Sequence, residues 1–369
     1  MTRKKMKRIA VLTTGGDCSG LNSVIRSVVI SATELGIEVL GIRNASDGLL
    51  SDPYQYEVLS VKKFVNFPYE RMGGTMLGTN SSSAGAAGSK NVDDKQKIKI
   101  FAKAVKALKI DGIVTVGGDG GTSIMAEYCT KAGVPMIAVP KTIDNDTPYT
   151  EQAVGFATAR EICVEALDRL DTTAASHHRV MILEVMGRSA GHIALHTAIA
   201  GGADICLIPE VRYSYKGVIK KLESVRKAGG KHSLIVVAEG IKTEDGKPLV
   251  AQKGDGLRYA GAGDFLQERI NSMTNAFVVR TTVLGHVQRG GTPYALDRLI
   301  ATCFGAKAVQ MLSEGKSYYM TTWQGNKVVP VPLDKVVKTS TSKVDIKGDF
   351  VKTALSLGMY IGDVKPVRC

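Results

Sequence analysis

Short apolar runs alternate along this chain with helix-like segments, and this alternation constrains the fold more than any other feature. The runs are IAVL (9–12), EVLGI (38–42), DGIVTV (111–116), MIAV (136–139), VMILEV (180–185), ICLIP (205–209) and SLIVVAE (233–239). Helical spacing brings apolar residues onto one face in the segments 21–35 and 98–108. Strands that are apolar on both faces and alternate with helices form parallel sheets covered by helices on both sides. The sequence therefore predicts an α/β fold with mostly parallel sheets.

Polar or glycine-rich loops lie where predicted strands end. They are TTGGDCSG (13–20), GGDGGT (117–122), PKTIDND (140–146), EVMGRSAG (184–191), AEG (238–240) and LGHVQRGG (284–291). In open parallel sheets ligands bind outside the carboxyl ends of the strands, so these loops together indicate one large active site. Neither the Walker A motif nor the GxGxxG spacing occurs in them, which excludes a P-loop and gives no support to a dinucleotide fold.

The two glycine-rich loops combine groups that attract and repel phosphate. Backbone N–H groups in a glycine turn at a helix start bind phosphate, and the candidates are Gly15, Gly16, Gly117, Gly118, Gly120 and Gly121. Asp119 would repel phosphate unless a divalent cation lies between the two. Mg²⁺ is usually held by one or two carboxylates together with substrate phosphates, so we expect Mg²⁺ at Asp119, with Asp146 holding the ion or its waters. Close packing of the turn against its strand is the alternative for either loop.

TIDND (142–146) carries two carboxylates two residues apart. In extended backbone Asp144 and Asp146 would point the same way, whereas in a turn they would diverge. A hydroxyl that accepts a phosphoryl group needs a base, which contributes roughly 10²- to 10⁴-fold in rate. One aspartate for the metal and one for the hydroxyl is the simplest division of roles. An Asx turn, in which the carboxylate binds its own backbone, is the alternative.

Composition limits the compartment and the partners. The 369 residues allow one large or two ordinary domains, and no apolar run approaches the length that spans a bilayer. The six cysteines show no CxxC pair and no metal-ligand spacing, so we expect free thiols in a soluble, cytoplasmic protein with no membrane partner. The net charge of +13 suits an anionic partner, but aromatic residues make up only 6% and do not alternate with the basic ones. Nucleic acid is therefore not an expected partner.

The motifs GGDG, TIDND, MGR and LGHVQRGG, in this order, resemble the phosphofructokinase family from residue 9 to about residue 305. ALSLGMYIGD (354–363) is similar to the tails of the branch that includes pyrophosphate-dependent members. The resemblance implies two Rossmann-like three-layer α/β/α domains with the active site in the cleft between them. It implies a phosphate-donor domain of residues 1–155 plus about 288–333, and a fructose 6-phosphate domain of residues 156–287 plus about 334–369. The implied reaction transfers the terminal phosphoryl group of Mg-ATP to the 1-hydroxyl of fructose 6-phosphate, a step of glycolysis.

The matching positions carry the family's roles over residue by residue. The resemblance implies Asp144 as the base, Thr142 as a contact of the transferred phosphate, and Arg188 as the group that stabilises the phosphoryl group in flight. It implies a donor and Mg²⁺ site made of Gly16, Gly118, Asp119, Gly120, Gly121, Thr122 and Lys141, with Asp146 as a second metal residue. It implies a sugar-phosphate site made of Thr142, Asp144, Met186, Gly187, Arg188, Glu239, His286 and Arg289, with Arg179 and Arg280 supplied by a neighbouring subunit. Shared sites of this kind imply a homotetramer or a homodimer.

Positions 120 and 141 favour different phosphoryl donors. In the family, an aspartate at position 120 accompanies pyrophosphate, because its side chain would crowd and repel the α-phosphate of a nucleotide. Gly120 leaves that space open and favours ATP, whereas Lys141 is typical of pyrophosphate users. Because a steric block is harder to evade than an additional attractive charge, we expect ATP as the donor.

Two departures from the family pattern concern the donor. Asn80 and Ser81 stand where the family commonly has an arginine that bridges the donor phosphates, and Lys90 or Lys141 would supply the missing charge. Arg43 stands where many members have an aromatic residue, so packing against adenine is open.

Three other functions stay open. One is a pyrophosphate-dependent phosphofructokinase. A second is an NAD or lipid kinase of the wider GGDG superfamily, against which MGRSAGH and LGHVQRGG speak, because those substrates need no pocket for a 6-phosphate. The third is a catalytically weakened regulatory or binding protein, which Ser81 favours and the retained Asp119, Thr142, Asp144 and Arg188 oppose.

Overall fold

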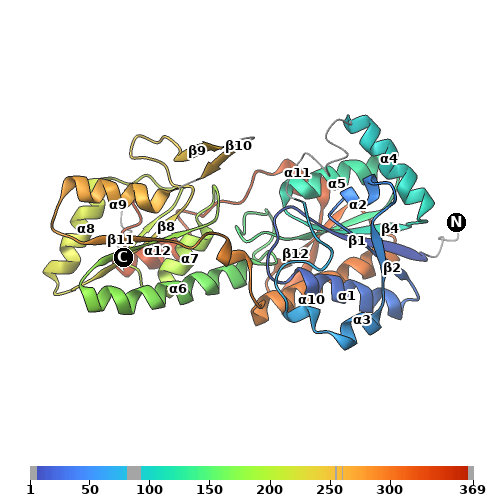
Figure 1. Ribbon diagram of the computed structural model, residues 1–369, viewed down its shortest axis with the longest axis horizontal. Helices are drawn as coiled ribbons and strands as arrows, with labels where there is room; N and C mark the ends of the chain where they lie inside the picture. Colours follow the sequence, from blue (N-terminus) through green and yellow to red (C-terminus); the bar gives the residue numbers. More distant parts are fainter. Residues whose placement is uncertain (1–5, 81–92, 254–255, 260, 365–369) are drawn as a thin grey trace. The chain divides into compact units, whose positions relative to one another are not determined.

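The computed structural model describes residues 6–80, 93–253, 256–259 and 261–364 (Figure 1). The chain divides into two compact units. Unit 1 consists of residues 1–143, 147–158 and 289–341, and unit 2 of residues 144–146, 159–288 and 342–369. Each unit therefore collects segments that are far apart in the sequence.

Unit 1 is built on a seven-stranded sheet in the order β13-β12-β5-β4-β1-β2-β3. Its strands are β1 (Arg8–Thr14), β2 (Glu38–Ile42), β3 (Tyr56–Leu59), β4 (Gly112–Gly117), β5 (Met136–Pro140), β12 (Tyr319–Gln324) and β13 (Lys327–Pro332). Neighbouring strands from β12 to β2 pair in parallel, and the edge strands β3 and β13 pair antiparallel. The central strands β1, β4 and β5 are buried on almost every residue, as expected for a parallel sheet covered on both faces.

Helices cover both faces of this sheet (Figure 1). On one face lie α1 (Leu21–Glu34), α3 (Val61–Asn66) and α10 (Ala295–Ser313), and on the other lie α2 (Asp47–Leu50), α4 (Asp94–Ala107), α5 (Asp119–Ala132) and α11 (Leu333–Lys338). A single-turn helix, η1 (Tyr69–Arg71), follows α3. α1 and α10 approach closely, because a Cβ at Gly305 would lie 2.7 Å from the carbonyl oxygen of Val24. Unit 1 is thus a three-layer α/β/α structure.

Unit 2 is built on a parallel four-stranded sheet in the order β11-β6-β8-β7. Its strands are β6 (Val180–Val185), β7 (Ile205–Leu207), β8 (Ser233–Ala238) and β11 (Val279–Val283). In Figure 1, α8 (Tyr215–Lys227) and α9 (Ala262–Met273) lie on one side of the sheet, and α6 (Phe156–His177) and α7 (His192–Ala200) on the other, with α12 (Asp349–Ser356) against α7. The hairpin of β9 (Val250–Lys253) and β10 (Gly256–Tyr259) and the short helix η2 (Gly285–Arg289) complete the unit.

The predicted α/β class with mostly parallel sheets is confirmed. All seven apolar runs form strands, and the two amphipathic segments form α1 and α4. The sequence did not predict β3, β9 to β13 or the antiparallel edges. Edge strands such as β3 and β11 are exposed or half-buried at most residues, so they lack the two-sided apolar pattern. Over the described ranges, no helix is long and apolar enough to cross a membrane.

Candidate active site

In unit 1 the carboxyl ends of β1, β4 and β5 lie level with one another. Thr14 pairs with Gly117, and Gly117 pairs with Pro140, so the loops that begin at residues 15, 118 and 141 start side by side. α1 connects β1 to β2, whereas α5 connects β4 to β5 in the opposite direction along the sheet. The gap between β1 and β4 is therefore a topological switch point, where ligands of open α/β sheets bind.

The loop glycines of unit 1 differ in what surrounds them. A Cβ at Gly117 or Gly121 would lie 2.5 Å from the side chain of Thr14, so these two glycines allow close packing. A Cβ at Gly16 would lie 2.9 Å from Nη1 of Arg289, whose guanidinium therefore lies against the first loop. At Gly120, within the described part of the chain, no atom lies within 4 Å of a Cβ. Gly120 is therefore the position in the second loop where a ligand group has room next to the backbone.

Asp119 and Thr122 lie in the first turn of α5. This end of the helix carries free N–H groups and the positive end of the helix dipole, both of which favour an anion. The hydroxyl oxygen of Thr122 is buried and has no hydrogen-bond partner among the described residues. No group of three metal-ligating side chains lies together in the described ranges, and Asp119 fits an ion that takes its other ligands from phosphate and water.

Lys141 connects the three loops of unit 1. Its side chain is 4% exposed, and its Nζ donates to the carbonyl oxygen of Gly16 in the first loop. Its backbone N–H donates to the carbonyl oxygen of Gly117 at 3.0 Å, at the start of the second loop. The positive charge of Lys141 is thus held where the glycine loops meet.

A pocket of about 190 Å³ adjoins the second loop. Thr14, Asp47, Asn80, Gly121 and Ile124 are among the residues that line it. Its volume is below the range of whole-ligand pockets, roughly 300–1,000 Å³, so it suits part of a ligand.

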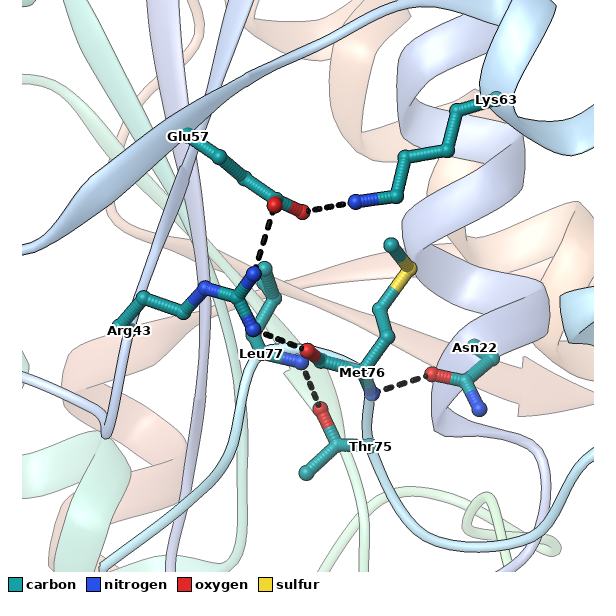
Figure 2. Close-up of polar contacts among 7 residues, drawn as sticks. All are labelled: Asn22, Arg43, Glu57, Lys63, Thr75, Met76 and Leu77. Atoms are coloured by element: carbon teal, nitrogen blue, oxygen red, sulfur yellow. Dashed lines mark hydrogen bonds and ion pairs between the residues drawn. The ribbon is translucent and has the colours of Figure 1, made fainter.

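The segment that ends at this pocket is held by Arg43 (Figure 2). Arg43 donates to the carbonyl oxygen of Met76 at 2.7 Å and to the carboxylate of Glu57 at 2.6 Å, and Lys63 binds the other oxygen of Glu57. Asn22 accepts from the N–H of Met76 at 2.8 Å. Arg43, which replaces the family's aromatic residue, therefore anchors the loop before Asn80. Ser81 and Lys90 lie outside the described residues.

In unit 2 the ends of β6, β8 and β11 also lie level. Val185 pairs with Ala238, and Glu184 pairs with Val283, so Met186 and Glu239 begin neighbouring loops. α7 leads from β6 to β7, whereas α9 leads from β8 to β11 in the opposite direction. The loops with Met186 and Glu239 therefore flank the switch point of this sheet.

The backbone after β6 adopts a left-handed conformation at two successive residues. Gly187 has φ +132° and Arg188 has φ +50°. For a non-glycine residue this region costs of order 1–3 kcal/mol, and it persists only where the surroundings enforce it. Glu239 accepts from the backbone N–H of Arg188 at 3.0 Å, and Gly240 passes so close that a Cβ there would overlap the carbonyl oxygen of Arg188. Glu239 and Gly240 thus help to hold the strained residue.

Asp144 and Arg188 come together within unit 2. Asn145 has φ +51°, so Asp144 and Asp146 flank a turn and not an extended segment. The carboxylate of Asp144 is 10% exposed and lies 3.8 Å from Nε of Arg188, whose side chain is 64% exposed. A pair with so exposed an arginine contributes little stability. The arrangement instead leaves the exposed guanidinium of Arg188 beside the buried carboxylate of Asp144, where the guanidinium can bind an anionic ligand.

Gln288 supports the same loops, although it was not singled out from the sequence. It is 1% exposed, its Oε1 accepts from the N–H of Met186 at 3.1 Å, and its Nε2 donates to the carbonyl oxygen of Gly285 at 2.8 Å. Its position inside the motif LGHVQRGG was the one feature of the sequence that could have indicated a role at the site.

Arg179 and Arg280 lie at the other end of the unit 2 sheet. Arg179 directly precedes β6, and Arg280 is the second residue of β11, where it pairs with Met181. At about 3.3 Å per residue, the length of β6 separates this end from Met186 by roughly 20 Å. His286 is exposed and belongs to unit 2, whereas Arg289 belongs to unit 1. The structure therefore does not bring the two arginines to the Met186 loop of their own chain.

Two buried ionisable groups near these loops have raised pKa values. Burial raises the pKa of Cys18 to about 12, so its thiol is no nucleophile at neutral pH. Burial also raises the pKa of Glu184, the nearby charges of Glu239 and Asp264 add to the effect, and a hydrogen bond from Gly263 opposes it.

The fold and these loops define an α/β protein built to handle phosphate. Glycine turns, a helix start, a buried lysine and carboxylates meet at the switch point of unit 1. A buried aspartate and an arginine meet at the ends of the unit 2 strands. These are the groups that phosphoryl transfer requires for positioning and charge stabilisation.

Comparison with known proteins gives the family. The family model described as Phosphofructokinase matches residues 8–312. The chain is 43% identical over 361 residues to "ATP-dependent 6-phosphofructokinase 1" of Nostoc sp., covering 97% of this chain and 99% of that protein. It is also 43% identical over 365 residues to "ATP-dependent 6-phosphofructokinase" of Chloroflexus aurantiacus, with the same coverage. The chain belongs to the phosphofructokinase family.

Solved structures agree with this assignment. Phosphofructokinase from Saccharomyces cerevisiae is similar with a TM-score of 0.76 and 28% identity over 90% of this chain, which spans 45% of that longer chain. A pyrophosphate-dependent phosphofructokinase from Marinobacter aquaeolei has a TM-score of 0.77 over 98% of this chain and 94% of its own, at 20% identity. At that identity the second likeness shows the fold alone.

Proposed function

We propose that this chain transfers the terminal phosphoryl group of ATP to the 1-hydroxyl of fructose 6-phosphate, giving fructose 1,6-bisphosphate and ADP, as a step of glycolysis. The full-length relatives in Nostoc and Chloroflexus carry this activity in their names. We also propose a cytoplasmic location, since the five described cysteines are free thiols, which suits a reducing compartment.

The open space over Gly120 is the observation that carries the choice of ATP. A nucleotide extends beyond its transferred phosphate, and it needs room next to the start of α5. The space over Gly120 and the adjoining pocket of about 190 Å³ supply room for the α-phosphate and for part of the nucleoside. Lys141, held at the glycine loops, would serve the transferred phosphate and take over the charge that an arginine at position 81 supplies elsewhere in the family.

Asp119 and Asp146 are the residues proposed to hold Mg²⁺. Carboxylates, together with phosphate oxygens and waters, are the ligands that this ion prefers. The bound ion would neutralise charge on the donor phosphates and so permit a carboxylate in a phosphate loop. The half-buried Asp119 at the start of α5 fits this role.

The acceptor half of the reaction is assigned mainly to residues of unit 2, with Thr142 and Arg289 from unit 1. Asp144 would take the proton from the 1-hydroxyl, and Arg188, 3.8 Å from Asp144, would bind the phosphoryl oxygens as the group moves. Thr142, two residues before Asp144, would contact the transferred phosphate. Met186, Gly187, Glu239 and His286 would hold the sugar phosphate. Arg289 is proposed for its 6-phosphate, although its guanidinium lies against Gly16 of the donor loop.

The wild-type protein tests this proposal with two donors side by side. Fructose 1,6-bisphosphate formation is measured with Mg-ATP and with Mg-pyrophosphate in matched coupled assays. We expect turnover with ATP and little with pyrophosphate. Efficient use of pyrophosphate alone would make the chain a pyrophosphate-dependent enzyme, and no turnover with either donor would favour a weakened regulatory protein.

Gly120→Asp tests the donor assignment directly. We expect it to abolish use of ATP, because the carboxylate would occupy the open space and repel the α-phosphate. A carboxylate at a helix start is favourable, so the variant should fold. Gly120→Ala is the matched control, and it should keep ATP turnover within a few-fold of wild type because its Cβ meets no described atom. Equal ATP turnover in Gly120→Asp and Gly120→Ala would contradict the assignment.

A further inference from the structure

Residues 342–344 lie where the chain returns from unit 1 to unit 2, after α11 and before α12. We call them the clamp segment. The N–H of Ser342 donates to the carbonyl oxygen of Asp146 at 2.7 Å, and the ring of His192 hydrogen-bonds the backbone of Ser342. The clamp segment therefore contacts both the turn that carries Asp144 and the start of α7.

Lys343 ties the clamp segment to the residue that follows Arg188. Its Nζ donates to Oγ of Ser189 at 2.7 Å and also to the carbonyl oxygen of Ser189. Both bonds come from a charged donor, which makes them stronger than bonds between neutral groups.

Glu210 ties the clamp segment to the same loop at a second point. A single oxygen, Oε1, accepts from the N–H of Gly191 and from the N–H of Val344, each at 3.0 Å. Gly191 fits closely there, since a Cβ would lie 2.5 Å from Cβ of Ile208 and 2.8 Å from Oε2 of Glu210. Glu210 thus joins the two backbone segments through one carboxylate.

We propose that Lys343 and Glu210 are positioning residues for phosphoryl transfer. They hold the loop 187–191 at Ser189 and Gly191, whereas Glu239 holds it at Arg188, so that the strained backbone of Arg188 keeps its guanidinium beside Asp144. The bond from Ser342 to Asp146 sets the two halves of this arrangement relative to each other. This inference rests on the proposed function for the roles of Asp144 and Arg188.

Lys343→Met removes the clamp at an exposed side chain, so the variant is expected to fold. We expect kcat to fall about tenfold, the size of one lost charge-assisted hydrogen bond, with KM for ATP unchanged because the donor loops lie in unit 1. KM for fructose 6-phosphate should rise, since Gly187 belongs to the released loop and Met186 directly precedes it. Lys343→Arg keeps a charged donor and should recover at least half of the wild-type kcat.

Lys347→Met is the matched control. Lys347 is exposed between the clamp segment and α12, and among the described residues its side chain makes no hydrogen bond or ion pair. All kinetic constants should match wild type. An equal loss in Lys347→Met and Lys343→Met, or no rescue by Lys343→Arg, would overturn the proposal.

Amide hydrogen exchange gives a readout that does not depend on catalysis. In Lys343→Met, exchange in the peptide covering 186–192 should become at least several-fold faster, while exchange in β8 stays unchanged. Unchanged exchange in 186–192 would overturn the proposal that Lys343 holds this loop, whatever the kcat of the variant. If the wild-type protein does not phosphorylate fructose 6-phosphate, the proposed function is wrong. In that case the exchange experiment still tests whether Lys343 stabilises the loop 187–191.

Discussion

At the scale of single residues, the assignment of Asp144 as the base makes the sharpest prediction. Asp144→Ser should lower turnover by roughly 10²- to 10⁴-fold, the range for loss of a general base. Binding of fructose 6-phosphate should persist, because the residues of the Met186 loop and Glu239 remain. Steady-state assays give the rate, and titration calorimetry with fructose 6-phosphate gives the binding constant.

The control for Asp144→Ser is Asp168→Ser, at an exposed aspartate of α6. This control should leave both rate and binding unchanged. A rate above about a tenth of wild type in Asp144→Ser would be too high for a lost base and would reject the role.

The sequence could indicate which residues gather at the site, but it could not distinguish the glycines of GGDGGT. Gly117 and Gly121 are needed because Thr14 of the neighbouring strand leaves no room for a side chain, whereas Gly120 faces open space. That difference depends on the register of β1 against β4, which a motif does not encode. Arg43 is a similar case, because its partners Glu57 and Met76 are set by the fold of the segment before Asn80 (Figure 2).

At the scale of elements, burial decided what could be predicted. β1, β4, β5, β6 and β8 are apolar on both faces because helices cover both sides of their sheets, and all five were predicted. β13 is an edge strand that pairs only with β12, and it contains two prolines, which edge strands tolerate. Its sequence therefore lacks the continuous apolar run that predicted the buried strands. The sequence also gave no reason to expect Arg280 at the amino end of a strand, since β11 was not predicted, whereas the predicted strand 180–185 begins directly after Arg179.

The starts of α6 and α10 are joined by a buried carboxylate that the sequence did not reveal. Asp297 is 1% exposed and accepts from the N–H of Gly155 at 2.9 Å and from the N–H and hydroxyl of Thr158 at 2.7 and 2.6 Å. Asp297→Ala leaves these buried donors unsatisfied, at a cost of about 3 kcal/mol. A cost of that size should lower Tm by roughly 6–12 °C for a unit of about 200 residues.

Differential scanning calorimetry measures this change. The matched control is Asp349→Ala, at the first turn of α12, where the side chain is 98% exposed and pairs only weakly with Lys352. Its Tm should stay within about 2 °C of wild type, because exposed pairs contribute little. Equal shifts in the two variants would show that Asp297 does not join the two helices.

At the scale of the whole molecule, each unit is assembled from separated segments, and this was beyond the reach of local patterns. Residues 144–146 belong to unit 2, although residues 147–158 return to unit 1. β12 pairs with β5 across an interval that contains residues 144–146 and 159–288, the larger part of unit 2. Hydrophobic periodicity identifies each strand but carries no information on such long-range pairing. The resemblance to a family supplied the two-domain expectation that the pattern itself could not.

The positions of Arg179 and Arg280 lead to a prediction about assembly. They lie roughly 20 Å, the length of β6, from the Met186 loop of their own unit, so a role in sugar-phosphate binding requires the site of a neighbouring subunit. We therefore propose that active sites are shared in a homotetramer or a homodimer. Each site would take Asp144 from one chain and Arg280 from another.

Hybrid oligomers test this sharing. Arg280→Ala and Asp144→Ser chains, each nearly inactive alone, are mixed after dissociation and allowed to reassociate. Half of the sites lie on chains with an intact Asp144, and half of those have a neighbour with an intact Arg280, so about a quarter of the wild-type activity should return in a symmetric oligomer. The control pairs Arg188→Ala with Asp144→Ser. Because Arg188 and Asp144 lie 3.8 Å apart in one unit of one chain, every hybrid site would lack one of them and no activity should return.

Two results would show that the sites are not divided between subunits in this way. One is recovery of activity in the control pair, and the other is no recovery in verified hybrids of Arg280→Ala and Asp144→Ser chains.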